Sequence, residues 1–181
     1  MRVIAGREKG RRLHTVSSTS TRPTTDRVKE ALFNIIGNSI YDASFLDLFA
    51  GNGGIGIEAL SRGAKTAVFV EKSRLCTETI KLNLTITSFL DQGEIIIKDV
   101  FSGLKILGGR DEKFNFIFLD PPYSRGLIEP TLRFINKYKL LSHNGLVICE
   151  HNIKEEIPKL MLKLSRVRTE DYGDTAIGFY R

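Results

Sequence analysis

The hydrophobic positions of this chain follow two alternating patterns. Short unbroken apolar runs are typical of strands buried in a parallel sheet, and they occupy residues 44–50, 66–70, 94–98, 114–119 and 145–150. Before and between them, apolar residues recur three or four positions apart, as on one face of a helix, over residues 26–36, 55–62, 73–88, 101–107, 126–141 and 154–160. Two final runs, 162–168 and 175–180, flank residues 172–174 and predict an antiparallel pair.

Two of the expected helices have a core-facing side that the spacing specifies. Over residues 26–36 the charged residues Arg27, Lys29 and Glu30 are expected to lie off this side. Its buried residues are expected to be Val28, Ala31, Leu32, Ile35 and Ile36. Over residues 73–88 the inward side chains are expected to be Leu75, Ile80 and Leu84. Both helices should therefore pack on the sheet.

The alternation of strand and helix predicts an α/β fold, a doubly wound and mostly parallel sheet of seven strands with helices on both faces. The 181 residues suffice for one domain with a sizeable core and are too few for two independent cores in separate domains. No apolar run is long enough to span a membrane, and the N-terminus turns basic at once instead of forming a signal sequence. A cytoplasmic protein without a membrane segment is therefore expected. Two distant cysteines and three scattered histidines lack the spacing of metal ligands, so no metal is expected.

A glycine-rich loop directly follows the first apolar run. Residues 51–56 fit the pattern G-x-G-x-x-G between a strand and a helix, where glycines allow a tight turn and close approach of a ligand. Asp47 precedes the loop, Glu58 follows it, and the next two strands end at Glu71 and Asp99. In doubly wound sheets, ligands bind beyond these carboxyl ends.

Three ligands can be weighed for such a loop. A dinucleotide would place its pyrophosphate near Asp47 and Glu58, which would repel it, and no Gly-Lys-(Ser/Thr) follows for a nucleoside triphosphate. The two carboxylates instead suit a cationic amino group, such as the methionine end of S-adenosylmethionine. Glu71 could then accept the ribose hydroxyls and Asp99 the adenine amine. Tight strand–helix packing without any ligand remains the alternative.

The tetrapeptide Asp120-Pro121-Pro122-Tyr123 ends the apolar run 114–119. Two prolines stiffen the backbone just beyond the sheet, so the corner can hold a planar, amine-bearing ring against Tyr123. The Asp120 carboxylate and the Pro121 carbonyl could then accept the two N–H groups of the amine. The tetrapeptide resembles the (Asp/Asn)-Pro-Pro-(Tyr/Phe) motif of methyltransferases that modify base amines in nucleic acids. A strand-terminating turn without chemistry is the alternative.

Positive charge is concentrated at the N-terminus. Residues 1–30 carry eight Lys/Arg against three Asp/Glu, a net of +5, whereas the other 151 residues carry nineteen against eighteen, a net of +1. Short strand-like runs at 2–5 and 12–16 predict a basic β-hairpin that would contact the phosphates of a nucleic acid without reading its sequence. The candidate nucleic-acid-binding residues, which the resemblance given below makes RNA-binding, are Arg2, Arg7, Arg11, Arg12, Arg22 and Arg27. A solvated tail without function is the alternative. The expected division is a basic extension that contacts nucleic acid, 1–24, and a catalytic domain, 25–181.

Over most of its length the chain resembles the bacterial methyltransferases that modify guanine N2 in small-subunit (16S) ribosomal RNA. The likeness is carried by residues 2–6, 10–13, 22–34, 47–64 and 120–123. The stretch Arg-Pro-Thr-Thr-Asp-Arg-Val beginning at Arg22 is much more specific than the glycine loop. One departure is Asn52, where relatives often have Ser or Thr. After Tyr123 the likeness is diffuse.

The resemblance implies a Rossmann-like methyltransferase that uses S-adenosylmethionine to methylate guanine 966 of 16S rRNA, within the small ribosomal subunit or its assembly intermediate. It places Asp47, Gly51 and Gly53 at the methionine end, Glu71 at the ribose, and Asp99 with Val100 at the adenine. The catalytic corner would be Asp120, Pro121, Pro122 and Tyr123. The candidate cofactor residues also include Phe49 and Lys72. A monomer is expected.

Other functions keep the same fold. An adenine-N6 methyltransferase acting on DNA, or an enzyme that methylates a protein glutamine, would change only what enters the pocket. A DNA enzyme that reads sequence generally carries an extra recognition domain, for which this chain has no room. A catalytically silent RNA-binding relative is disfavoured by the intact glycine loop and Asp120.

Overall fold

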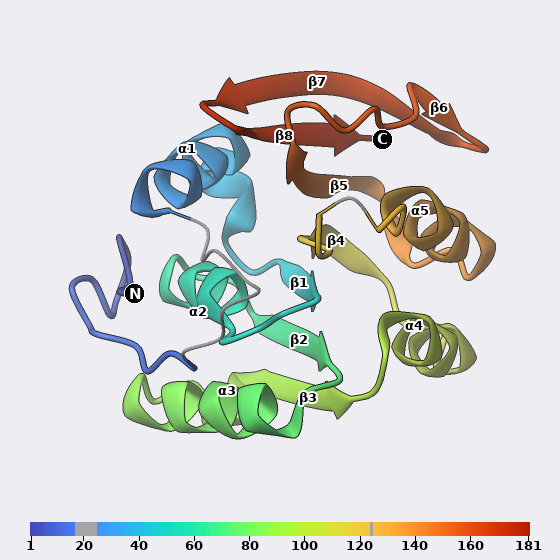
Figure 1. The fold of residues 1–181 in the computed structure, drawn as a ribbon. Helices are drawn as coiled ribbons and strands as arrows, with labels where there is room; N and C mark the ends of the chain where they lie inside the picture. The colour runs from blue at the N-terminus through green and yellow to red at the C-terminus, as the bar shows by residue number, and fades with distance from the viewer. Residues whose placement is uncertain (17–24, 124) are drawn as a thin grey trace.

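The computed structural model describes residues 1–16, 25–123 and 125–181. Its centre is an eight-stranded sheet in the order β3-β2-β1-β4-β5-β8-β7-β6, which runs from bottom to top in Figure 1. The strands are β1 (Ser44–Leu48), β2 (Thr66–Glu71), β3 (Gly93–Ile97), β4 (Phe114–Leu119), β5 (Leu141–Asn152), β6 (Leu160–Met161), β7 (Leu164–Tyr172) and β8 (Thr175–Tyr180). The first five pair in parallel, and β8 and β7 continue the sheet antiparallel.

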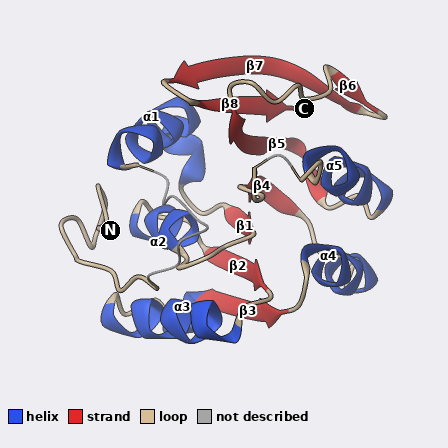
Figure 2. Cartoon of the chain, in the orientation of Figure 1, coloured by secondary structure: helices blue, strands red, loops and turns tan. Residues whose placement is uncertain are grey.

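Helices cover both faces of this sheet, as the alternating pattern predicted. Their bounds are α1 (Asp26–Ile36), α2 (Gly54–Ser61), α3 (Arg74–Ile86), α4 (Val100–Gly109) and α5 (Ile128–Lys137), with short 3-10 turns η1 (Gly37–Ile40) and η2 (Leu90–Gln92). Figure 2 shows α1, α2 and α3 on one side of the sheet and α4 and α5 on the other. The doubly wound α/β architecture is therefore confirmed.

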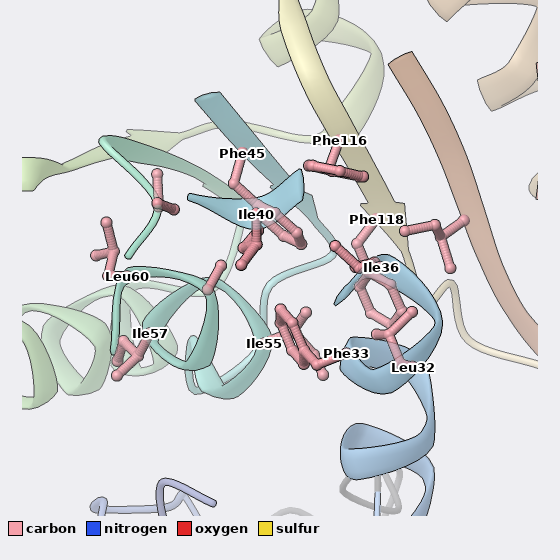
Figure 3. Close-up of a cluster of buried hydrophobic side chains, with 14 of the residues drawn as sticks. Leu32, Phe33, Ile36, Ile40, Phe45, Ile55, Ile57, Leu60, Phe116 and Phe118 are labelled. Atoms are coloured by element: carbon pink, nitrogen blue, oxygen red, sulfur yellow. The ribbon is translucent and has the colours of Figure 1, made fainter. Parts of the chain in front are cut away.

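Each face of the sheet has its own hydrophobic core. On the α1–α3 side, Phe33 stacks on Phe45, and Phe45 stacks on Phe116, with ring centroids 6.3 and 6.4 Å apart. Figure 3 shows how side chains from α1, η1 and α2 meet those of β1 and β4 there. The other core joins the intervening strand residues to α4 and α5. Because nearly all residues of β1 and β4 are buried on both faces, these strands read as nearly continuous apolar runs rather than alternating ones.

The C-terminal third differs from expectation in two ways. The helix expected over residues 154–160 does not form, because Pro158 lacks a backbone donor and its carbonyl accepts a hydrogen bond from the Tyr180 hydroxyl at 2.7 Å. Instead, a turn after Asn152 leads to the two-residue strand β6, which pairs with β7. The described sheet thus has eight strands rather than seven. The antiparallel pair around residues 172–174 is confirmed.

Two helix faces also need correction. Leu75, expected inside, is 59% exposed because it lies in the first turn of α3, on the side away from the sheet. Lys29, expected outside, is only 1% exposed. Its Nζ donates to the Arg2 carbonyl at 2.6 Å and lies 3.6 Å from Oε2 of Glu58. An ion pair therefore buries a side chain that helical spacing alone places in solvent.

The N-terminal segment folds back on itself without forming a ladder. A single antiparallel bridge joins Arg2 and Arg12, supported by a bond from the Val3 N–H to the Arg11 carbonyl at 3.0 Å. The expected strands at 2–5 and 12–16 are thus reduced, in the described residues, to a loop closed by this bridge. Val3 and Leu13 are buried in the core on the α1–α3 side, so the loop is docked on the domain beside α2 and α3 (Figure 2).

Glu58 of α2 explains how the loop is held. Its two carboxylate oxygens accept the backbone N–H groups of Ile4 and Ala5 at 2.8 and 3.0 Å, and Arg62 lies 2.7 Å from Oε1. The loop approaches α2 so closely that a Cβ on Gly6 would lie 1.9 Å from the Ser61 carbonyl oxygen. The expectation that Glu58 faces a ligand ammonium is therefore wrong: this carboxylate is fully buried and binds the N-terminal segment.

Candidate active site

The candidate residues gather at the carboxyl edge of the parallel strands. Asp47 lies near the end of β1, Glu71 ends β2, and Asp99 follows β3. Asp120 comes directly after β4, the neighbour of β1 in the sheet. Parallel strands present their carboxyl ends along the same edge, so the four carboxylates that were separated by up to 73 positions come to one edge of the sheet.

The glycine loop turns sharply between β1 and α2. Gly51 and Gly53 have φ of 53° and 77°, and Phe49 also has a positive φ of 57°, a conformation that only glycine adopts without strain. A Cβ on Gly53 would lie 3.1 Å from the Ile80 side chain. The Gly51 N–H donates to Oε2 of Glu71 at 3.0 Å, which ties the loop to the end of β2.

Asp47 is the most buried of these carboxylates. It is 2% exposed and accepts the Gly56 N–H of α2 at 2.9 Å. Burial raises the pKa of Asp47 to about 8, against the lowering effect of the Gly56 bond. A cation bound beside Asp47 would restore its charged form, so this position fits a ligand ammonium.

The ends of β2 and β3 provide two more carboxylates. Glu71 also accepts the Ser73 N–H at 2.8 Å, which holds it at the start of α3. Asp99 caps α4 by accepting the N–H groups of Phe101 and Ser102 at 3.0 and 3.1 Å. Hydrogen bonds from Ser102 lower the pKa of Asp99, so it stays charged at neutral pH. The remaining candidates flank these two carboxylates: Lys72 is exposed beside Glu71, and Val100 is the buried first residue of α4.

The proline corner follows β4 as expected. Asp120 is partly buried, Pro121 is buried, and Tyr123 is 37% exposed. Burial raises the pKa of Asp120 well above its usual value, and the charges of Glu150 and Asp47 raise it further. Burial likewise raises the pKa of Tyr123 to about 12, so its hydroxyl keeps its proton.

Glu150 lies at the candidate site, and the sequence pattern missed it. It is 3% exposed on β5, and its Oε1 accepts the Tyr123 hydroxyl at 3.5 Å. The same hydroxyl lies 3.4 Å from Oγ1 of Thr175 on β8. The sequence held one signal, because Glu150 ends the apolar run 145–150 just as Asp120 follows the run 114–119.

Four of the six candidate RNA-binding arginines, Arg2, Arg7, Arg11 and Arg12, belong to the N-terminal loop. Residues Arg7 to Arg12, together with Ile86, line an open hollow of about 640 Å³. Arg2 pairs with Asp26, and Arg11 pairs with Glu8, both at 3.0 Å. Arg27 is exposed on α1, and Arg22 lies outside the described residues.

The basic loop also reaches the glycine loop. The Val16 N–H donates to Oδ1 of Asn52 at 3.0 Å, and the Asn83 side chain donates to the carbonyls of both His14 and Asn52 at 3.0 Å. The same Asn83 accepts the His14 N–H at 2.8 Å. Asn52 therefore links the N-terminal segment to the candidate cofactor loop.

The described part of the chain holds no group of three or more His, Cys, Asp and Glu side chains placed to bind a metal ion. None of its helices combines the length and the apolar character needed to cross a membrane.

Comparison with known proteins shows a full-length likeness. The family described as Conserved hypothetical protein 95 matches residues 1–181. YlbH of Bacillus subtilis (strain 168) is 41% identical over 181 residues, which cover 100% of this chain and 98% of that protein. Ribosomal RNA small subunit methyltransferase D of Escherichia coli (strain K12) is 34% identical, with coverages of 100% and 89%. The solved structure of yhhF from Escherichia coli superimposes with a TM-score of 0.87 at 33% identity, covering 99% of this chain and 96% of that one.

Proposed function

Since the chain belongs to the family of ribosomal RNA small subunit methyltransferase D, we propose that it methylates the exocyclic N2 amine of a guanine in 16S rRNA. The chain is an rRNA methyltransferase that depends on S-adenosylmethionine. The finer assignments are ours: guanine 966 as the target, a small subunit or its assembly intermediate as the substrate, and a monomer acting in the cytoplasm.

The residues at the sheet edge fit the cofactor. We assign the methionine end to Asp47, Phe49, Gly51 and Gly53, because the buried carboxylate and the positive-φ loop together suit an ammonium lying close to backbone. We assign the binding of the ribose to Glu71 and the neighbouring Lys72, and the binding of the adenine to Asp99 and Val100. When bound, S-adenosylmethionine supplies a methyl carbon activated by the neighbouring sulfonium.

The proline corner would prepare the guanine amine for attack. The lone pair of N2 is delocalised into the ring, and hydrogen bonds accepted from its two N–H groups by Asp120 and the Pro121 carbonyl would localise it. Pro122 keeps the corner stiff, and the Tyr123 ring stacks on the base. Most of the rate enhancement would come from aligning the attacking nitrogen, the methyl carbon and the sulfur. The proton that leaves the amine would pass to Asp120 or to water.

One observation carries this assignment. Asp47 lies two residues after Phe45 on β1, and Asp120 lies two residues after Phe118 on the adjacent β4. Phe45 and Phe118 belong to the same core. Because side chains alternate along a strand, Asp47 and Asp120 lie on the same face of the sheet. The charge of Asp47 also contributes to the raised pKa of Asp120. A base held at the corner would therefore lie beside the ligand held at the glycine loop.

We assign RNA contact to residues 1–24, as an extension of the catalytic domain 25–181. Its candidate residues are Arg2, Arg7, Arg11, Arg12, Arg22 and, at the start of α1, Arg27. The bonds through Asn52 and Asn83 support this assignment, because they place the basic segment next to the cofactor loop. A base would have to be extruded from its stack to reach the corner.

Transfer of a radiolabelled methyl group tests the proposal. The protein is incubated with labelled S-adenosylmethionine and, in separate reactions, with small subunits, naked rRNA and DNA, and digested nucleosides are separated. Label in N2-methylguanosine from rRNA or subunits is expected. Label in N6-methyladenine, or label that stays with protein, would contradict the assigned substrate. Nucleoside mass spectrometry of rRNA from cells lacking the gene should show the loss of one N2-methylguanosine.

A further inference from the structure

Three carboxylates lie on one face at the carboxyl edge of three neighbouring strands. Side chains alternate along a strand, and Phe45, Phe118 and Ile148 all belong to the core on the α1–α3 side. Two residues further along their strands come Asp47, Asp120 and Glu150. The parallel register pairs Leu119 with Cys149, so the next step places Asp120 beside Glu150, on strands about 4.8 Å apart.

Glu150 is a member of this row without an assigned role. It contacts the corner directly, because its Oε1 lies 3.5 Å from the Tyr123 hydroxyl. Its negative charge also contributes to the raised pKa of Asp120. It is also only 3% exposed. Burying a carboxylate is costly, and in enzymes such costs concentrate at functional sites. Glu150 therefore stands where a base held by Asp120 and Tyr123 would present its edge.

Guanine and adenine differ at the position next to their reactive amine. In guanine, the N2 amine lies beside N1–H, so that edge offers neighbouring donors. In adenine, the N6 amine lies beside an N1 with a lone pair, which is an acceptor. A carboxylate accepts hydrogen bonds and donates none when ionised. It therefore attracts the guanine edge and repels that of adenine, which is how a site gains specificity.

We propose that Glu150 is a specificity-determining residue that accepts a hydrogen bond from N1–H of the target guanine. Asp120 and the Pro121 carbonyl hold the amine, and Glu150 holds the adjacent ring nitrogen. This inference rests on the proposed function, and it explains how a corner that also suits adenine would accept guanine alone. The hydrogen bond between the Tyr123 hydroxyl and Glu150 then fixes the distance between the ring that stacks on the base and the carboxylate that recognises its edge.

The base 2-aminopurine separates recognition at N1 from the reactivity of the amine. It keeps the amine at position 2 but carries a lone pair at N1, as adenine does. Small subunits are reconstituted with rRNA ligated from two pieces, so that the target nucleotide is either guanine or 2-aminopurine. Initial rates of labelled methyl transfer are compared for the wild type and Glu150→Gln. The Gln amide can donate to the N1 lone pair, whereas the Glu carboxylate cannot.

The expected result is a change in base preference. Glu150→Gln should lower the ratio of the guanine rate to the 2-aminopurine rate by about 10- to 100-fold, the discrimination that a good base contact provides. Thr175→Val is the matched variant, because it removes the other contact of the Tyr123 hydroxyl. It should slow both bases equally. Glu156→Gln, an exposed change outside the site, should leave both rates unchanged.

Other outcomes would overturn the inference in distinguishable ways. If Glu150→Gln slows both bases equally, as Thr175→Val does, then Glu150 only positions Tyr123 and does not read the base. If circular dichroism and cofactor calorimetry show that Glu150→Gln does not fold, the same ratio of rates measured for Glu150→Asp tests the role of Glu150. This variant draws the carboxylate back by one methylene and should reduce the guanine preference by a smaller factor, and an unchanged preference would refute the reading role. Absence of transfer to guanine by the wild type would instead refute the proposed function.

Discussion

Asp47 and Asp120 show how position changes the chemistry of one residue type. Both are aspartates at the end of a parallel strand, and burial raises the pKa of each. Asp99, on the exposed side of the same edge, has its pKa lowered by the hydrogen bonds of Ser102. Shifts in opposite directions at one edge are typical of a site with divided roles.

Asp120→Ala should separate cofactor binding from methyl transfer. The corner loses the acceptor that prepares the amine, so the turnover rate should fall about 10²- to 10³-fold, the effect of removing one preorganised polar group. The dissociation constant of S-adenosylmethionine, measured by calorimetry, should stay nearly unchanged because Asp47 and Glu71 remain. Glu112→Ala, at the opposite end of β4, is the control and should keep both properties. Equal loss of binding and transfer in Asp120→Ala would contradict the assigned role.

Cofactor binding should release a proton from Asp47. The pKa of about 8 in the cofactor-free protein means that Asp47 is mostly protonated at pH 7, and a bound ammonium would lower that pKa. Binding that releases a proton strengthens as pH rises, so the association constant should increase between pH 6 and 8. Calorimetry in two buffers of different ionisation enthalpy measures the proton count. The release should disappear in Asp47→Asn, and a persistent release in that variant would assign it to another group.

At the scale of elements, one buried ion pair joins three parts of the chain. Lys29 of α1 and Glu58 of α2 meet where Arg2, Ile4 and Ala5 of the N-terminal loop cross both helices. Burial lowers the pKa of Lys29, although Glu58 and Asp26 act in the other direction. Such a pair specifies an arrangement at an energetic cost, and here it fixes the loop on the domain.

Removing one partner of this pair should destabilise the protein strongly. Lys29→Met leaves the Arg2 carbonyl and a buried Glu58 with fewer partners, so the free energy of unfolding should fall by about 3 kcal/mol. Arg133→Met breaks an exposed pair with Glu129 on α5, and it should cost about 0.5 kcal/mol or less. Urea unfolding followed by circular dichroism measures both. Similar losses in the two variants would show that the Lys29 pair does not hold the loop.

At the scale of the whole molecule, the basic N-terminal loop and the glycine loop are brought to the same side. The excess positive charge belongs to the first 30 residues. Of these, residues 1–16 fold into the N-terminal loop, which packs beside α2 and α3 through Val3 and Leu13 (Figure 1). Through Asn52 they touch the turn between β1 and α2. RNA attracted by this segment would thus be delivered to the edge that holds the proline corner.

Reversing charge on the loop should weaken RNA binding while sparing the cofactor site. Arg11→Glu with Arg12→Glu should reduce affinity for small-subunit rRNA and lower the slope of log affinity against log salt by about 2, one for each lost phosphate contact. Filter binding at several salt concentrations measures the slope, and calorimetry should show unchanged cofactor affinity. Lys105→Glu with Lys163→Glu makes the same charge change outside the loop and should have a smaller effect. Equal effects of both pairs would indicate attraction by net charge alone.

The sequence by itself determined the parallel core, the glycine loop and the proline corner. Each depends on neighbouring residues: an apolar run for β4, positive-φ glycines at 51 and 53, and two prolines after Asp120. Local spacing even predicted the bounds of α1 and β4. These features follow from short-range sterics and periodicity, which a sequence displays directly.

Tertiary structure alone decided which polar side chains are buried and what they touch. Helical spacing predicted Lys29 in solvent, and the position of Glu58 after the glycine loop predicted it at a ligand. The two are instead paired inside the protein, where residues 2–5 cross both helices. Glu150 and Asp120 are 30 positions apart in the sequence, and they lie next to each other only because β5 pairs with β4. Desolvation and ion pairing depend on what distant segments bring into contact, and no local pattern of residues records that.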